Sequence, residues 1–328
     1  MKYYKVALDL MGSDKGPEMM LRGAKMALDK YEDLALLLVG DEGIIKSECE
    51  NLAFPMDRVE ILGSSEVITN YDSPATALFE KPRSSLVLAL DATAKREDIV
   101  GLVNAGSTGA LIGGSVRFLM REDRVRPALA AALPAERGGF VCLVDTGATI
   151  DATAQMLVHF ARLGTEFMRD MYKIESPRVA LLSNGAEETK GNKTVKEAHA
   201  LLKTAEGVNF VGNVEGTNAL SGDCDVLVAD GFAGNQVLKV TEGTARRIIT
   251  DIVKIAKKTG NEGYMALVGT LMAKYDFNSL GGGIILGVRK PVVKAHGAAN
   301  EASIVSTVGI VLNLAKNKDV FNNQNKED

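Results

Sequence analysis

Short, continuously apolar runs alternate with amphipathic stretches along most of the chain. Continuous runs are typical of strands in a parallel sheet that is covered on both faces. Between two such runs, residues 17–31 predict a helix, because apolar side chains recur at helical spacing after Gly16 and Pro17, a helix start signal. The alternation predicts a doubly wound α/β architecture with right-handed crossovers. The predicted strands are YKVALDL, LALLLVG, RVEIL, DIVGLV, FVCLVD, RVALLS, VNFVG and DVLVAD.

Polar side chains followed by glycines stand where five of the predicted strands end. A single Asn or Asp before a glycine is ordinary turn chemistry, because both residues tolerate turn conformations. Ligands of open α/β sheets, however, bind beyond the carboxyl ends of the strands, so five such ends on one edge favour a binding site. The pairs are Asp9 with Gly12, Asn104 with Gly106, Asp145 with Gly147, Asn184 with Gly185, and Asp230 with Gly231.

The stretch DIVGLVNAGSTGALIGG at residues 98–114 predicts a strand, a tight loop and a helix start. Such a loop offers backbone N–H groups to an anion. It lacks the lysine of a Walker A sequence and the first glycine of a dinucleotide fingerprint, which argues against a nucleotide. Its amides and the hydroxyls of Ser107 and Thr108 suit a small tetrahedral anion, and an ordinary helix N-cap explains the loop equally well.

One further loop and the histidines are candidate sources of catalytic groups. The loop LLSNGAEETKGNKT carries Lys190 and Asn192, although a lone loop lysine is usually a solvated surface charge. His159 and His199 lie in helical patterns and are interpreted as packing or surface residues, while His296 follows a strand-like run. The spacing of the histidines matches neither a Ser/His/Asp triad nor a zinc-binding H-E-x-x-H motif.

Composition narrows the class of protein. The chain has 328 residues and a formal net charge of −4, without the basic excess of nucleic-acid-binding proteins. Cys49, Cys142 and Cys224 share no C-x-x-C spacing, so neither disulfides nor zinc are expected. No apolar run is long enough to span a membrane, which predicts a cytoplasmic protein with at most peripheral membrane contact. We expect one α/β domain at residues 1–317 and a polar, frayed tail at residues 318–328.

The chain resembles the PlsX family, the acyl-ACP:phosphate acyltransferases of bacterial phospholipid synthesis, in five motifs between residues 5 and 315. In order, these are ALDLMGSDKGP, NAGSTGAL, GAEETKGN, VADGFAGN and PVVKAHG. The chain departs from the family's usual motifs in having Ser13 for the second glycine of M-G-G-D, Ser107 for the Asn of A-G-N-T-G, and Thr149 for the Asn of D-x-G-A-N. These exchanges affect single hydrogen bonds and not the chemistry.

The resemblance implies that inorganic phosphate attacks the thioester of a long-chain acyl carrier protein, giving acyl phosphate and a free thiol. It also implies a homodimer with a three-layer α/β/α sandwich, a mostly parallel sheet like that of isocitrate and isopropylmalate dehydrogenases and of phosphotransacetylases. A thioester is already activated, so no metal, cofactor or covalent nucleophile is expected. Because acyl phosphate feeds phosphatidic acid and phospholipid synthesis, a membrane glycerol-3-phosphate acyltransferase is an expected partner.

Site roles follow from placing that reaction on the matching motifs. Lys190 is expected to neutralise developing charge, and Asp230 to orient or deprotonate the attacking phosphate. The loop from Asn104 to Gly109, together with Asn235, is expected to hold the phosphate through amides and hydroxyls. The full set of predicted phosphate- or substrate-binding residues is Asp9, Asn104, Gly106, Ser107, Thr108, Gly109, Asn192, Gly234, Asn235 and His296.

Basic charge is concentrated at residues 239–275, which carry seven basic and three acidic residues. The segment 239–277 predicts a protruding hairpin of two helices joined at KKTGNEG, the second with an apolar stripe. Such a stripe is typical of a core or a dimer interface; a basic, apolar hairpin also suits an acidic carrier protein and an anionic membrane surface. The residues predicted to make these contacts are Arg246, Arg247, Lys254, Lys257, Lys258, Leu267, Val268, Leu271 and Met272.

Three other functions remain open on the sequence. A phosphotransacetylase or phosphotransbutyrylase would use coenzyme A in place of the carrier protein. An isocitrate-type dehydrogenase would need an acidic metal site and arginines for substrate carboxylates, but the arginines at residues 117–126 resemble a solvated helix end. A membrane scaffold without enzymatic activity would explain the hairpin and leave the polar strand ends without a role.

Overall fold

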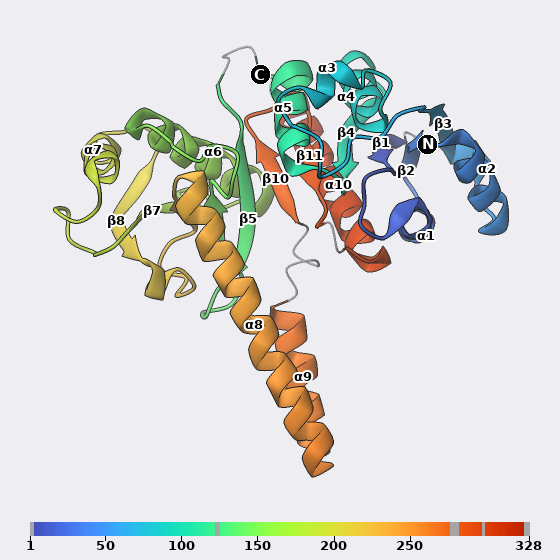
Figure 1. Ribbon diagram of the computed structural model, residues 1–328. Coiled ribbons are helices and arrows are strands. Elements are labelled where there is room, and N and C mark those ends of the chain that lie inside the picture. The colour runs from blue at the N-terminus through green and yellow to red at the C-terminus, as the bar shows by residue number, and fades with distance from the viewer. Residues whose placement is uncertain (1–2, 122–124, 276–281, 297–298, 325–328) are drawn as a thin grey trace. The chain divides into compact units, whose positions relative to one another are not determined.

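Helices and strands alternate throughout the computed structural model, which describes residues 3–121, 125–275, 282–296 and 299–324 (Figure 1). The elements form two compact units. The first consists of Met1–Ala128, Asp170–Lys173 and Gly281–Asp328, and the second of Leu129–Arg169 and Ile174–Leu280. In both units most neighbouring strands are parallel, which confirms the predicted α/β class.

The strands of the first unit lie in the order β3-β2-β1-β4-β11-β10. All neighbours are parallel except β10 and β11, which pair antiparallel. Every residue of β2 is buried, as its uninterrupted apolar sequence predicts. The strands are β1 (Tyr4–Asp9), β2 (Leu34–Gly40), β3 (Val59–Gly63), β4 (Ile99–Asn104), β10 (Gly283–Leu286) and β11 (Val292–Lys294).

Three helices of the first unit start at polar side-chain caps. Asp41, Ser84 and Ser107 each accept a backbone N–H with the side chain, at the start of α2, α4 and α5. Helix α1 packs on α10 so closely that a Cβ at Gly23 would lie 2.7 Å from the Cβ of Ile304. The helices are α1 (Gly16–Lys30), α2 (Glu42–Asn51), α3 (Ala77–Glu80), α4 (Ser85–Lys95), α5 (Thr108–Leu119) and α10 (Glu301–Gln324), with a short 3-10 turn at Met56–Arg58.

The second unit has the strand order β5-β6-β9-β7-β8. Strands β5 and β6 form an antiparallel pair, and the others are parallel. Its core includes the buried side chains of Leu133, Leu143 and Leu227. The strands are β5 (Ala128–Pro134), β6 (Phe140–Val144), β7 (Arg178–Ser183), β8 (Asn209–Glu215) and β9 (Val226–Val228); the helices are α6 (Ala154–Tyr172), α7 (Lys193–Leu202), α8 (Gly231–Thr259) and α9 (Glu262–Lys274), with a 3-10 turn at Gly216–Asn218.

Helices α8 and α9 form the predicted helical hairpin, which extends away from the strands of the second unit (Figure 1). Gly260 ends α8 in the left-handed conformation with φ +64°, and the Asn261 side chain caps α9. Residues 276 and 277 of the predicted hairpin lie outside the described residues. Helix α10 continues to Gln324 into the predicted polar tail, and residues 325–328 lie outside the described residues.

All eight predicted strands are present within a few residues of their expected ends. The eight predicted strands do not include β5, β10 or β11, although the strand-like run before His296 coincides with β11. Strands β5 and β10 each take part in an antiparallel pair. The antiparallel strands β5 and β6 are nearly as buried as the parallel ones, so a continuous apolar run favours a parallel strand without excluding an antiparallel one.

Candidate functional site

The predicted polar strand ends divide between the two units. Asp9 and Asn104 end the parallel neighbours β1 and β4 in the first unit, where they pair directly in register. In the second unit, Asp145, Asn184 and Asp230 follow β6, β7 and β9, which are parallel neighbours. Each unit therefore gathers its polar strand ends along one edge, where α/β folds bind ligands.

In the first unit, Asp9 and Asn104 form a buried hydrogen-bonded pair. Asn104 donates from Nδ2 to Oδ2 of Asp9 at 2.6 Å, and its Oδ1 accepts the N–H of Gly106 at 3.0 Å. Oδ1 of Asp9 accepts the N–H of Met11 at 3.2 Å. Both side chains are 1% exposed. The pair thus holds the turns after both strands in place.

Burial raises the pKa of Asp9 to about 6. Hydrogen bonds from Ser85, Asn104 and Met11 and the charge of Lys294 act in the opposite direction, because they favour the ionised carboxylate. Lys294 is itself 7% exposed and lies beside Asn104 in register on β11. Lys294 was not identified from the sequence as a candidate site residue, although it lies in the PVVKAHG motif. It could have been found as a lysine at the end of a short buried strand.

The loop after Asn104 leads into α5 and leaves backbone donors available. Oγ of Ser107 accepts the N–H of Ala110 at 3.4 Å, so Ser107 is the N-cap of α5. Within the described residues, the N–H groups of Ser107, Thr108 and Gly109 have no hydrogen-bond acceptor. Three consecutive free donors at a helix start suit an anion. His296, predicted to bind substrate, is exposed.

In the second unit, the start of α8 packs against the turn after β6. The carboxylate of Asp145 accepts four backbone N–H groups from Leu129, Gly147, Ala148 and Thr149, at 2.6 to 3.2 Å. Burial raises the pKa of Asp145, and these bonds oppose the shift. A Cβ at Gly234 would overlap the Asp145 carbonyl oxygen, so only glycine permits this approach. The hydroxyl of Thr149 is buried and has no partner among the described residues.

Asp230 and Asn235 flank that contact. Oδ1 of Asp230 accepts the N–H of Ala233 at 2.7 Å, which makes Asp230 the N-cap of α8. Asn235 is half-buried, and a Cβ on Gly147 would lie 3.5 Å from its Nδ2. The amide of Asn235 makes no hydrogen bond within the described residues and is available to a ligand.

Lys190 lies in the loop between β7 and α7. Its side chain is exposed and forms no ion pair with any described residue, and its N–H donates to the carbonyl of Glu187 at 3.0 Å. A Cβ at Gly185 would lie 2.5 Å from Cγ of Lys190, so the lysine stem rests on that glycine. Asn192 is the N-cap of α7, because its Oδ1 accepts the N–H of Val195 at 2.9 Å.

The described residues contain no group of three or more His, Cys, Asp or Glu side chains arranged to hold a metal ion. Nor does any helix among them combine the length and the apolar content needed to cross a membrane.

The hairpin exposes apolar and basic side chains together. Val240, Leu267 and Met272 are 63%, 44% and 57% exposed, whereas Val268 is buried against α8. Arg247 and Lys254 pair with Asp251. Among the described residues, Arg246, Lys257 and Lys258 have no acidic partner.

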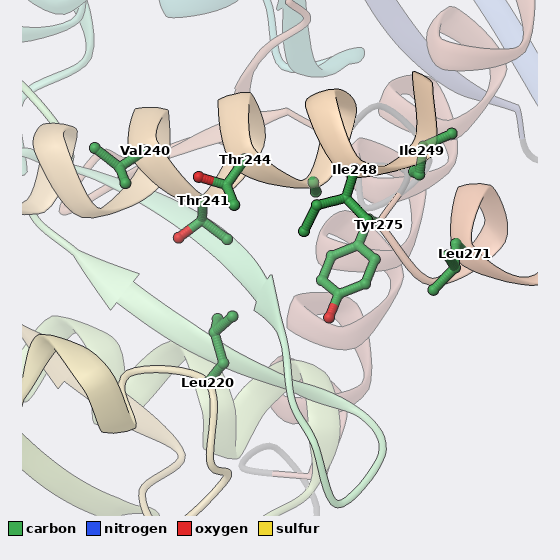
Figure 2. A pocket seen from close by; sticks show the side chains of 9 residues that line it. Leu220, Val240, Thr241, Thr244, Ile248, Ile249, Leu271 and Tyr275 are labelled. Carbon is green, nitrogen blue, oxygen red and sulfur yellow. The ribbon is translucent and has the colours of Figure 1, made fainter. Parts of the chain in front are cut away.

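An apolar cavity of about 340 Å³ lies between α8, α9 and Leu220 (Figure 2). Leu220 also packs on the core of the second unit, so the cavity begins where that core ends. It is lined by Leu220, Val240, Thr241, Thr244, Ala245, Ile248, Ile249, Leu271 and Tyr275. The predicted contact residue Leu271 therefore lines this cavity and is not fully exposed.

Comparison with known proteins finds relatives that share the name phosphate acyltransferase. The model of a family described as "Fatty acid synthesis protein" matches residues 4–320. A phosphate acyltransferase of Halothermothrix orenii is 38% identical over 317 residues, which cover 93% of each chain. One from Lactococcus lactis subsp. cremoris is 39% identical over 314 residues, covering 93% of this chain and 92% of the relative.

Solved structures share the fold at much lower identity. A phosphotransacetylase from Streptococcus pyogenes superposes with a TM-score of 0.64 at 15% identity, covering 97% of this chain and 94% of the other. A 4-hydroxythreonine-4-phosphate dehydrogenase from Klebsiella pneumoniae superposes with a TM-score of 0.58 at 12% identity, covering 96% and 100%. The predicted fold class, shared by phosphotransacetylases and a group of dehydrogenases, is confirmed.

Proposed function

The chain belongs to the fatty acid synthesis protein family of phosphate acyltransferases, and from that membership we propose that it transfers a long-chain acyl group from acyl carrier protein to inorganic phosphate. An oxygen of phosphate attacks the thioester carbonyl, the new C–O bond forms, and the C–S bond breaks with release of the carrier thiolate. The product, acyl phosphate, enters phospholipid synthesis.

The three free N–H groups at the start of α5 carry the phosphate part of the proposal. Backbone donors at a helix start bind a small anion without a dedicated cation, and the Asp9–Asn104 pair fixes the loop that presents them. Ser107 caps the helix, which keeps these donors aligned. Asn235 belongs to the second unit and is proposed as a phosphate ligand from its sequence motif; its amide makes no hydrogen bond within the described residues.

Lys190 and Asp230 supply charge in this proposal. Lys190 is exposed without an ion-pair partner among the described residues, so its ammonium is free to neutralise charge that develops on phosphate or on the carbonyl oxygen. Asp230 uses Oδ1 as the cap of α8, while Oδ2 makes no hydrogen bond within the described residues. That oxygen is assigned to orient or deprotonate the attacking phosphate.

The test is release of free thiol from acyl carrier protein thioesters, with and without inorganic phosphate. We expect release to depend on phosphate and to fall strongly in Lys190→Ala and Asp230→Ala, each verified to be folded. Release that ignores phosphate would contradict the acyltransferase function. Near-normal turnover in both folded variants would contradict only the residue roles.

A phosphotransacetylase acting on acyl-coenzyme A is the second candidate, favoured by the shared fold. The two functions separate by donor: the carrier-dependent enzyme should use long-chain acyl carrier protein in preference to short-chain acyl-coenzyme A. Faster turnover with the short acyl-coenzyme A would reverse the order of the two candidates.

The hairpin is assigned to contacts with other macromolecules. Its basic residues that lack an acidic partner among the described residues suit the acidic carrier protein and anionic lipid. Its exposed apolar residues suit a membrane surface or the hairpin of a second copy in a homodimer. A membrane glycerol-3-phosphate acyltransferase would then receive the acyl phosphate at the membrane. Met272→Glu changes an exposed position and should release the protein from anionic vesicles with activity on soluble carrier protein retained. Loss of the dimer together with activity would assign the position to the subunit interface.

A further inference from the structure

His199 is a buried polar residue that the proposed reaction does not use. It lies in α7, is 5% exposed, and packs edge to face on Phe210 with ring centroids 5.0 Å apart. Its Nδ1 lies 2.8 Å from Oδ1 of Asn213 on β8. Burying a polar side chain costs free energy unless its polar atoms are hydrogen-bonded. The hydrogen bonds that complete this pair therefore have a consequence for the structure around it.

That consequence is a hydrogen-bonded connection to the loop that carries Lys190. Nδ2 of Asn213 donates to the carbonyl of Glu187 at 3.0 Å, and the same carbonyl accepts the N–H of Lys190 at 3.0 Å. Because Nδ2 of Asn213 is used in this way, its Oδ1 faces His199. Nδ1 of His199 therefore carries the proton and donates it.

Among the described residues, three other polar contacts reach this loop. The N–H of Gly191 donates to Oδ1 of Asn184 at 2.7 Å. The Glu188 carboxylate pairs with Lys203 at 2.7 Å on the surface and lies 3.9 Å from Nε2 of His199. An exposed ion pair contributes little to stability. The carbonyl of Glu187 is thus the point at which a buried side chain from the body of the unit holds the turn that ends in Lys190.

We propose that Asn213, oriented by His199, is a positioning residue for the acyl transfer: it fixes the Glu187 carbonyl and, through that carbonyl, the backbone from which Lys190 extends. The inference rests on the proposed role of Lys190. His199 and Asn213 are buried, and neither is assigned a contact with the substrate. Misplacing a charged group by about 1 Å can lower the rate of a reaction about 100-fold, so a single buried hydrogen bond is sufficient to matter.

Two substitutions of Asn213 isolate this bond. Asn213→Asp keeps the size and the acceptor for His199 and removes the donor to Glu187. Asn213→Leu removes the donor without adding charge. We expect kcat to fall about 10- to 100-fold in both, with KM for acyl carrier protein unchanged. A loss in Asn213→Asp alone would assign the effect to the new charge and overturn the positioning role.

Asn209→Asp is the matched control. Asn209 lies on the same strand, and its Nδ2 donates to a carbonyl as well, that of Ser176 at 3.2 Å, with both groups exposed. It should leave kcat unchanged. At the histidine, His199→Asn should retain more activity than His199→Leu, because a shorter amide can replace the Nδ1 donor. Equal activity of these two variants would contradict the orienting role of His199.

A double-mutant cycle separates positioning from a general loss of structure. In single turnovers at high enzyme concentration, Asn213→Asp should cost nothing further once Lys190 is replaced by Ala. A full, multiplicative loss in that background would overturn the proposal. If Lys190→Ala is impaired and Asn213→Asp is not, the positioning role fails while the proposed function stands; full activity of Lys190→Ala refutes the role of the lysine itself.

Discussion

Asp9→Asn should remove a pH dependence of stability that one buried carboxyl produces. Asp9 is 1% exposed, and its pKa in the folded chain is about 6, against 3.8 for the free side chain. Between these values the folded chain holds a proton that the unfolded chain has released. The stability that neutral Asp9 contributes is therefore complete below pH 3.8 and is lost as the pH rises through 6.

The size of the effect follows from the two pKa values. A difference of one pKa unit corresponds to about 1.4 kcal/mol, so the free energy of unfolding falls by roughly 3 kcal/mol over the whole range. About half of that loss occurs between pH 5 and pH 8. An Asn side chain at position 9 has a single acceptor oxygen, so it cannot accept hydrogen bonds from both Asn104 and Met11. The lost hydrogen bond lowers the free energy of unfolding by about 1 to 3 kcal/mol at every pH. At pH 5 the Asp9→Asn variant should therefore have a lower free energy of unfolding than the parent protein. At pH 8 this difference should be smaller by on the order of 1.5 kcal/mol.

Urea denaturation at pH 5 and pH 8 measures this difference directly. Asp41→Asn is the control, because it exchanges the exposed N-cap carboxylate of α2 for an equally good cap. We expect the Asp41 variant to follow the pH dependence of the parent protein. If Asp9→Asn also followed it, the carboxyl would not titrate as its burial requires, and the reasoning would be refuted.

Substitutions at three further positions test contacts at the strand ends. Gly185→Ala forces the stem of Lys190 to shift, so kcat should fall about tenfold with little change in thermal midpoint; an unchanged kcat would show that the stem is free to move. Gly234→Ala overlaps the Asp145 carbonyl and should lower the free energy of unfolding by about 2 kcal/mol or more in urea, which a wild-type midpoint would contradict. Ser107→Ala should cost about 1 kcal/mol of stability and raise KM for phosphate, whereas Ser107→Asp should restore the stability and not the KM.

The strands could be predicted because burial on both faces leaves an uninterrupted apolar sequence, as in β2. The antiparallel pair of β5 and β6 could not, because both strands are nearly fully buried and carry the same kind of apolar sequence as the parallel strands. The division into two units could not be predicted either, because it depends on contacts between residues that are distant in sequence. No linker rich in glycine or proline marks the boundary in the sequence.

The sequence indicated which residues lie at the strand ends, but not which residues they form hydrogen bonds with. Polar residues at strand ends identified Asp9 and Asn104, whose hydrogen bond joins residues 95 positions apart. His199 had the spacing of a packing residue, and only the neighbouring strand reveals that its ring nitrogen meets Asn213. Local sequence showed that Asp230 could end a turn, but its cap on α8 depends on the orientation of one carboxylate oxygen.

Helix α8 joins two regions with different proposed ligands. Its cap residue Asp230 belongs to the strand-end chemistry, and its last turn, Lys257 and Lys258, belongs to the tip of the hairpin. The helix has 29 residues and spans about 44 Å without a break. Thermodynamic linkage between two ligands of one protein is reciprocal: whatever factor a partner bound at the tip applies to phosphate affinity, phosphate must apply to the affinity of that partner.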